Sequence, residues 1–224
     1  MYKTLPIKIK FTSEQKTFWS EQCQHALSLY NSALYLVKQQ HYKRLEEDRA
    51  FNLYWRGDDL KCGWKTRKIL GIAYPTLDKL LKQNKHYAGI AAQGAQQVLK
   101  VLDQEIKSYN RLVDGFFNGK VDRPRIPRYK KHGGLSSLTF PTLQLTFLDG
   151  RVKLPVCKSA KDSMICSTWI DVPDFLQPDK IAQIRVRPSR GEWWIDWILD
   201  DGKQEIVHNP NLNYNHALSI DGYP

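Results

Sequence analysis

The first residues of the chain alternate between apolar and polar side chains. Ile7, Ile9 and Phe11 share one face of an extended chain, and Lys8 and Lys10 share the other. This period of two predicts a half-buried strand over residues 3–11. The stretch that follows is helical and offers this strand no partner. We therefore expect the strand to pair with the sheet predicted further along the chain.

Residues 12–118 place apolar side chains three and four positions apart, which is typical of helices with one buried face. Thr12 and Gln15 have the spacing of a capping box and predict the start of the first helix. A second long helix is predicted over residues 87–117, and Pro75 predicts a shorter one between them. Breaks are predicted at residues 56–59 and 62–64. The pattern favours a helical bundle.

From about residue 135 to residue 207 the period returns to two. Asp149-Gly150 separates two short alternating runs, which predicts a hairpin over residues 143–154. A second hairpin is predicted around residues 188–191, with Trp193, Ile195 and Trp197 on one face of its second strand. Several short strands with turns favour a small barrel or sandwich. The expected fold class is α+β, a β-barrel split by an inserted helical domain.

Composition narrows the function classes. Apolar residues make up 42% of the 224 residues and charged residues 25%, which is ordinary for a globular protein. No apolar run approaches a membrane span or a signal core, so we expect a cytoplasmic protein without a membrane partner. The four cysteines form no C-x-x-C pair, so no zinc site is predicted. The net charge of +11 favours a polyanionic partner.

Much of the positive charge lies in residues 119–131, which we call the connector because they join the last predicted helix to the sheet. Six of its residues are Lys or Arg and one is Asp. Pro124 and Pro127 favour an extended backbone, which can follow a phosphate backbone. A tyrosine in such a segment can stack on an unpaired base. The candidate nucleic-acid-binding residues here are Arg123, Arg125, Arg128, Tyr129, Lys130 and Lys131.

Further candidates lie outside the connector, and each has two interpretations. Lys8, Lys10, Arg185, Arg187 and Arg190 can line a nucleic-acid channel, or the last three can pair with Glu192 and Asp196. The tryptophans of the second hairpin can stack bases, but core packing is favoured. Residues 55–68 interleave aromatic and basic side chains, which fits single-stranded nucleic acid or a helix end with its aromatics turned inward. The scattered histidines predict no metal site.

Four segments, taken in order, resemble the N-terminal portion of the TnpB (OrfB) proteins of insertion sequences, relatives of type V CRISPR effector nucleases. They are Asn31-Ser32-Ala33-Leu34-Tyr35, then Gln96-Gln97-Val98-Leu99 with Phe116-Phe117, then Arg123-Pro124-Arg125 with Tyr129-Lys130-Lys131 and the strand at 138–141, and finally Leu218-Ser219-Ile220-Asp221-Gly222. Each motif is short, and their order and spacing carry the resemblance.

The resemblance implies a wedge-like, OB-like barrel formed by residues 1–11 and 119–212, a helical recognition domain over 12–118, and the start of a RuvC domain of RNase H fold at 213–224. It implies guide RNA and double-stranded target DNA as partners, RNA-guided DNA cleavage as the activity, and a prokaryotic, nucleoid-associated location. It also makes Asp221 the first carboxylate of a two-Mg²⁺ site. One carboxylate cannot hold two Mg²⁺ ions, and Asp221-Gly222 departs from the family's Asp-x-Gly, so we expect this chain alone not to cut.

Two alternatives remain. A shortened relative that no longer cleaves can bind RNA and DNA as a repressor or accessory factor. A plain basic RNA-binding domain would have no link to transposons, no guide RNA and no dependence on a flanking DNA motif.

Overall fold

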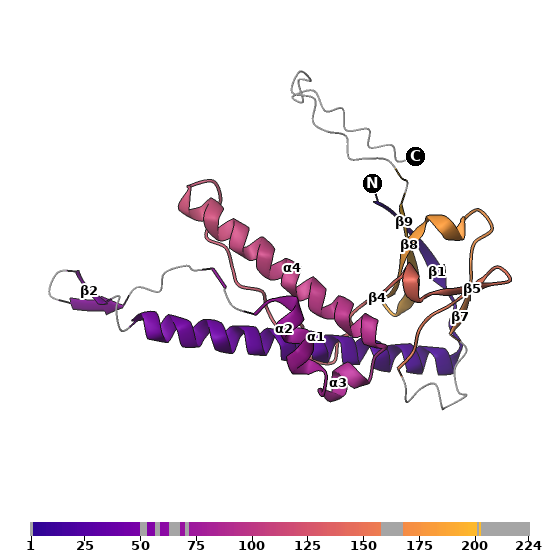
Figure 1. The fold of residues 1–224 in the computed structure, drawn as a ribbon, viewed down its shortest axis with the longest axis horizontal. Coiled ribbons are helices and arrows are strands. Elements are labelled where there is room, and N and C mark those ends of the chain that lie inside the picture. Colours follow the sequence, from indigo (N-terminus) through magenta and orange to yellow (C-terminus); the bar gives the residue numbers. More distant parts are fainter. Residues whose placement is uncertain are drawn as a thin grey trace, which may run out of the picture.

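The computed structural model describes residues 2–49, 53–56, 59–62, 68–69, 72–157, 168–200 and 202, with side chains described outside 47–62. The described chain is α+β with antiparallel sheets (Figure 1). The helices are α1 (Ser13–Arg49), α2 (Tyr74–Leu81), α3 (Lys85–Ala88) and α4 (Ala92–Phe117). The strands are β1 (Tyr2–Ile9), β2 (Leu53–Arg56), β3 (Asp59–Cys62), β4 (Leu138–Pro141), β5 (Thr146–Leu148), β6 (Arg151–Lys153), β7 (Trp169–Asp171), β8 (Ile181–Ser189) and β9 (Glu192–Asp200).

The first strand pairs with the last. All eight residues of β1 lie opposite β9, from Tyr2 against Asp200 to Ile9 against Trp193. The four-stranded sheet has the order β1-β9-β8-β4 and is antiparallel throughout. Leu5, Ile7 and Ile9 of β1 are half-buried. The predicted strand and its pairing with the later sheet are therefore confirmed.

Two hairpins turn where the sequence predicts them. Asp149-Gly150 and Arg190-Gly191 both have positive φ angles, as a tight hairpin turn requires. The first hairpin is shorter than predicted, because its first strand, β5, begins at Thr146. Leu143 is 98% exposed and lies in a 3₁₀ turn, η1 (Thr142–Gln144). Strands β5, β6 and β7 form a separate three-stranded sheet.

The helical layer begins at the predicted cap. The backbone N–H of Thr12 donates to Gln15 Oε1 at 3.0 Å, and the N–H of Gln15 donates to Thr12 Oγ1 at 3.3 Å. The buried stripe of α1 then packs on α4 and, near its start, on β4. Trp19 lies 6.2 Å from Phe140 between ring centroids and links the helices to the sheet. The sheets lie beside the first half of α1 (Figure 1).

Two predictions for the helical stretch are wrong. The long helix expected over 87–117 is interrupted between α3 and α4, and Gly89, which caps the end of α3, lies against the His25 ring. A Cβ at Gly89 would come within 2.9 Å of that ring. Residues 53–56 and 59–62, in the stretch expected to be helical, are instead the paired strands β2 and β3, with Leu53 opposite Cys62, and the break predicted at 56–59 falls where the two strands meet. The expected short helix at Pro75 is present as α2.

Among the described residues, none of the helices combines the length and the apolar character that crossing a bilayer requires.

Candidate nucleic-acid interface

The connector leaves the end of α4 and returns to the sheets across α1 (Figure 1). Residues 122–131 have neither helix nor strand hydrogen bonding. The side chain of Asn31, on α1, fixes this path: its Nδ2 donates to the carbonyl oxygen of Lys130, and the N–H of Lys130 donates to Asn31 Oδ1, both at 2.9 Å. One side-chain amide thus replaces the backbone partners that an extended segment lacks.

Lys130 turns its ammonium into the fold. Its Nζ donates to Ser136 Oγ at 3.0 Å and lies 4.2 Å from the centroid of the Tyr30 ring. Burial lowers the pKa of Lys130, and the carboxylate of Glu105 partly offsets this. Glu105 accepts a hydrogen bond from the Tyr30 hydroxyl. Lys130 therefore anchors the connector to the helices and is not exposed as its neighbours are.

The remaining predicted cations of the connector are exposed. We call them the four connector cations: Arg123, Arg125, Arg128 and Lys131. Within the part of the chain that the structure describes, none of them forms an ion pair. Such cations keep their full charge for an external anion, and phosphates are the usual one for Arg in an extended segment.

Exposed tyrosines lie beside these cations. Tyr129 of the connector is 47% exposed, and Tyr35 and Tyr42 of α1 are 54% and 43% exposed. The pKa of Tyr129 is raised, first by burial and then by the nearby hydroxyls of Tyr42 and Tyr35. Lys38 Nζ lies 4.3 Å from the centroid of the Tyr129 ring. Stacking surfaces and phosphate-binding charges therefore occur together, as single-stranded nucleic acid requires.

A shallow pocket of about 520 Å³ opens within this surface. Tyr35 and Tyr129 contribute to its lining, with Leu36 and Leu81 beside them. The residues Tyr35, Lys38 and Tyr42 were not predicted as site residues, although Tyr35 ends the first motif of the resemblance. They are three and four positions apart on α1, which is also the spacing of its buried residues, so the sequence pattern alone does not mark them as a separate exposed group.

The other predicted cations lie on the four-stranded sheet. Lys8 and Arg187 both lie opposite Trp194 in the strand register, so the three form one cross-strand row. Each cation has an acidic partner: Lys8 Nζ lies 2.5 Å from Glu192, and Arg187 donates to Asp196 from Nε at 2.8 Å and from Nη2 at 2.9 Å. Asp196 is only 3% exposed, so this pair belongs to the fold.

Three predicted cations remain. Arg185 is half-buried, and its Nε reaches Thr139 Oγ1 at 3.4 Å. Arg190 is exposed in the hairpin turn, and Lys10 is exposed just after β1. Neither lies in the connector. The structure therefore divides the predicted binding residues between the connector surface and a sheet face whose charges are partly neutralised.

The aromatic residues that were considered for base stacking lie partly in the core and partly outside the described side chains. Trp193 and Trp197 are buried in the core, as favoured, and Trp194 is half-buried beneath the Arg187 guanidinium, 5.6 Å from its ring centroid. The basic and aromatic residues between 55 and 67 lie outside the described side chains. Lys68, which follows them, pairs with Asp114 at 2.7 Å.

Asp221 and its motif lie outside the described residues, so the catalytic and Mg²⁺ roles implied for Asp221 stay predictions. Within the described part of the chain, no group of three or more His, Cys, Asp or Glu side chains is placed to hold a metal ion. Cys23 and Cys157 are buried thiols. Burial raises the pKa of Cys23 to about 12.

One close pair was not anticipated. His25 on α1 and His86 on α3 approach to 3.0 Å between their Nδ1 atoms. They are 61 residues apart in the chain, so their meeting depends on how α3 packs against α1. The pair joins two helices at the end of the layer close to the sheets.

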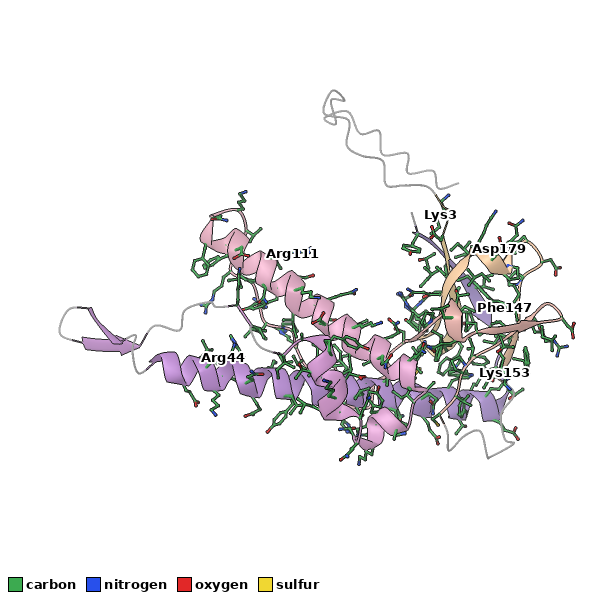
Figure 2. All side chains as sticks on the ribbon, viewed as in Figure 1. Lys3, Arg44, Arg111, Phe147, Lys153 and Asp179 are labelled. Carbon is green, nitrogen blue, oxygen red and sulfur yellow. The ribbon has the colours of Figure 1, made fainter. Side chains whose placement is uncertain are left out.

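Figure 2 shows the distribution of side chains over the molecule. Arg44 lies on the half of α1 away from the sheets and Arg111 on α4, whereas Lys3, Phe147, Lys153 and Asp179 surround the sheets. Basic residues therefore occur both on the helices and around the sheets. The connector differs from the other basic regions in the absence of ion pairs among the described residues and in its neighbouring exposed tyrosines.

Comparison with known proteins adds no family. No protein-family model matches the chain, and no curated protein sequence matches it. The resemblance to TnpB proteins thus rests on the motifs of the sequence itself.

Proposed function

We propose that this chain binds nucleic acid through the connector, as the guide-RNA- and target-DNA-binding portion of an RNA-guided DNA endonuclease of the TnpB kind. The observation that carries the proposal is the connector itself. Asn31 holds its backbone, and its four cations project without acidic partners among the described residues. The exposed tyrosines beside them supply stacking surfaces.

The chemistry favours a backbone-binding role. Arginine and lysine on an extended segment bind phosphates, which gives affinity without reading sequence. In an RNA-guided system base pairing supplies the specificity, so such a surface is what the protein must provide. The RuvC site and the closure of the sheets into a wedge-like barrel belong to the same proposal. A mechanism for cleavage does not follow from the described residues.

A charge-removal experiment tests the binding proposal. In one variant all four connector cations, Arg123, Arg125, Arg128 and Lys131, become alanine. The control variant changes four exposed lysines elsewhere, Lys16, Lys107, Lys153 and Lys180, so that the net charge falls equally. We expect the first variant to bind a labelled single-stranded RNA at least about 10-fold more weakly than the control, since each lost phosphate contact removes a released counterion.

Equal binding by the two variants would remove the connector from the interface. The identity of the RNA tests the remainder of the proposal. RNA recovered with the purified protein should include transcripts from the end of a mobile element. A random sample of cellular RNA would instead favour the plain RNA-binding alternative.

A further inference from the structure

The pocket between α1, the end of α2 and the connector has two aromatic walls. Tyr35 comes from α1 and Tyr129 from the connector, and both line the same space of about 520 Å³. Among the described residues neither ring stacks on another aromatic ring. Lys38 Nζ covers one face of the Tyr129 ring at 4.3 Å from its centroid. The opposite face of Tyr129 and the ring of Tyr35 are therefore the surfaces for a flat ligand. The volume lies within the range of about 300–1,000 Å³ that small-molecule sites occupy.

The floor and edges of the pocket are chemically distinct. Leu36 and Leu81 supply an apolar floor, and Leu81 is 5% exposed. Ser32 Oγ donates its proton to the carbonyl oxygen of Ser28 at 2.9 Å, so its lone pairs face outward as acceptors. Asn84 Oδ1 accepts a hydrogen bond from the N–H of His86 at 2.8 Å, and the Nδ2 donor of Asn84 has no partner among the described residues.

A flat ring with donors and acceptors on its edge fits this combination. A nucleobase has two π faces for tyrosines and a polar edge for a serine oxygen and an amide nitrogen. Lys38 Nζ lies 4.3 Å from the centroid of the Tyr129 ring, and the exposed Arg128 precedes Tyr129 in the chain, so both offer cations to the phosphates that flank a base. A purely apolar ligand would leave the Asn84 donor unpaired.

We infer that this pocket takes one unstacked nucleobase of the bound strand, held on the Tyr35 and Tyr129 rings and contacted at its edge by Ser32 and Asn84. The inference rests on the proposed function, since it gives that surface a subsite for a base beside its sites for phosphates. It adds a contribution to affinity that does not depend on salt.

Binding affinities measured for variants of both the protein and the ligand test this subsite. The variants are Tyr35→Ala and Tyr129→Ala, with Phe175→Ala as the control because Phe175 is an exposed aromatic residue outside the pocket. The ligands are a short labelled oligothymidine and the same sugar-phosphate chain with abasic sites in place of the bases. Each tyrosine variant should bind the oligothymidine about 10-fold more weakly, with an unchanged salt slope.

The abasic strand supplies the decisive comparison. The wild-type protein should bind it more weakly than the oligothymidine, and Tyr35→Ala and Tyr129→Ala should then cause no further loss. Tyr35→Phe and Tyr129→Phe, which keep the rings, should bind as the wild type. Circular dichroism shows whether each variant is folded.

The outcomes separate the two proposals. If the wild type binds the oligothymidine with a steep salt dependence but the tyrosine variants bind equally well, the base subsite is overturned and the phosphate surface stands. If the tyrosine variants lose the same factor on both strands, the rings act on the connector and the subsite is again overturned. If the wild type binds neither strand, the proposed function itself fails.

Discussion

Two asparagines, at different places in the helical layer, each bind a backbone segment through their side-chain amide. Asn31 makes a pair of hydrogen bonds with the backbone of Lys130, and Asn110 on α4 makes the equivalent pair with the N–H and carbonyl of Ile69. In both cases a side-chain amide satisfies a backbone segment that has no secondary structure of its own. The two residues therefore form a matched pair for experiment.

Asn31→Ala should lower the free energy of unfolding by about 1–3 kcal/mol, because two part-buried hydrogen bonds are lost at about 0.5–1.5 kcal/mol each. Asn110→Ala should cost about the same. Urea denaturation measures both. Only Asn31→Ala should also weaken RNA binding, since it alone frees the connector. An equal loss of binding in Asn110→Ala would point instead to the segment around Ile69.

Arg187 is expected to stabilise the sheet rather than bind a ligand. Its partner Asp196 is 3% exposed, so Arg187→Ala leaves a buried carboxylate without its counter-charge. We expect a loss of about 3 kcal/mol in the free energy of unfolding. Arg185→Ala should cost less than about 1 kcal/mol, because its bond to Thr139 is long at 3.4 Å. Similar losses for the two variants, measured in urea, would contradict the assignment.

At the scale of single residues, sequence predicts what is local. The two residues of the capping box, Thr12 and Gln15, are three positions apart, so its geometry follows from the helix start alone. Asn31 and Lys130 are 99 residues apart, and nothing near Asn31 in the sequence indicates which backbone it meets. For the same reason the sequence did not distinguish Lys130, which turns inward, from Lys131, which is exposed.

At the scale of elements, turns were easier to predict than helix ends. Asp149-Gly150 and Arg190-Gly191 have residues that accept positive φ angles, so both hairpins follow from turn chemistry. The break between α3 and α4 was not predicted; Gly89, which caps α3, packs against the His25 ring of another helix, a contact that the sequence around Gly89 does not indicate. The β2–β3 hairpin lies in a stretch whose overall period suggested helix, and its four-residue strands were too short to change that interpretation.

The packing of α3 on α1 predicts a response to pH. Burial lowers the pKa of His86 below 6.5, and the charges of His25 and Lys85 lower it further. Burial and Arg44 also lower the pKa of His41 on α1. Because the folded state takes up protons less readily than the unfolded chain, this stability is complete above pH 6.5 and is lost as the pH falls through the lowered values.

The free energy of unfolding should therefore be smaller at about pH 5.5 than at about pH 7.5, above the range in which carboxylates titrate. His86→Asn removes one of the two groups and should reduce the difference. Denaturant titrations at the two pH values measure it. A protein that becomes more stable on acidification over this interval would contradict the account.

At the scale of the whole molecule, the helices α1–α4 are inserted in the sequence between β1 and β4, which belong to one sheet. This arrangement was predictable because the first strand had no other partner. It also fixes both ends of the connector: one follows α4, and the other enters β4 of the same sheet. The connector thus crosses the helices between fixed points, and its four cations and Tyr129 are exposed along that path.

For the candidate binding residues, the structure adds the most to what the sequence indicates. The clustering of positive charge in residues 119–131 is visible in the sequence, and it led to the correct segment for an exposed, unpaired set of cations. The sequence leaves open whether Arg187 binds nucleic acid or pairs with Asp196, and the strand register brings the two together. The pairing of Lys8 with Glu192 joins β1 to β9 and was not among the predicted alternatives. The contribution of α1 to the tyrosine surface likewise depends on the path of the connector.

The salt dependence of RNA binding tests the central claim most directly. Four phosphate contacts from the four connector cations predict a slope of about −2.8 in log K against log salt for a single strand, which is about a 50-fold loss of affinity between about 50 mM and about 200 mM salt. The variant lacking all four cations should show a much shallower slope at the same net charge as the control variant. Fluorescence anisotropy of a labelled RNA measures all three proteins. Equal slopes for the two variants, or no binding by the wild type at low salt, would contradict the account.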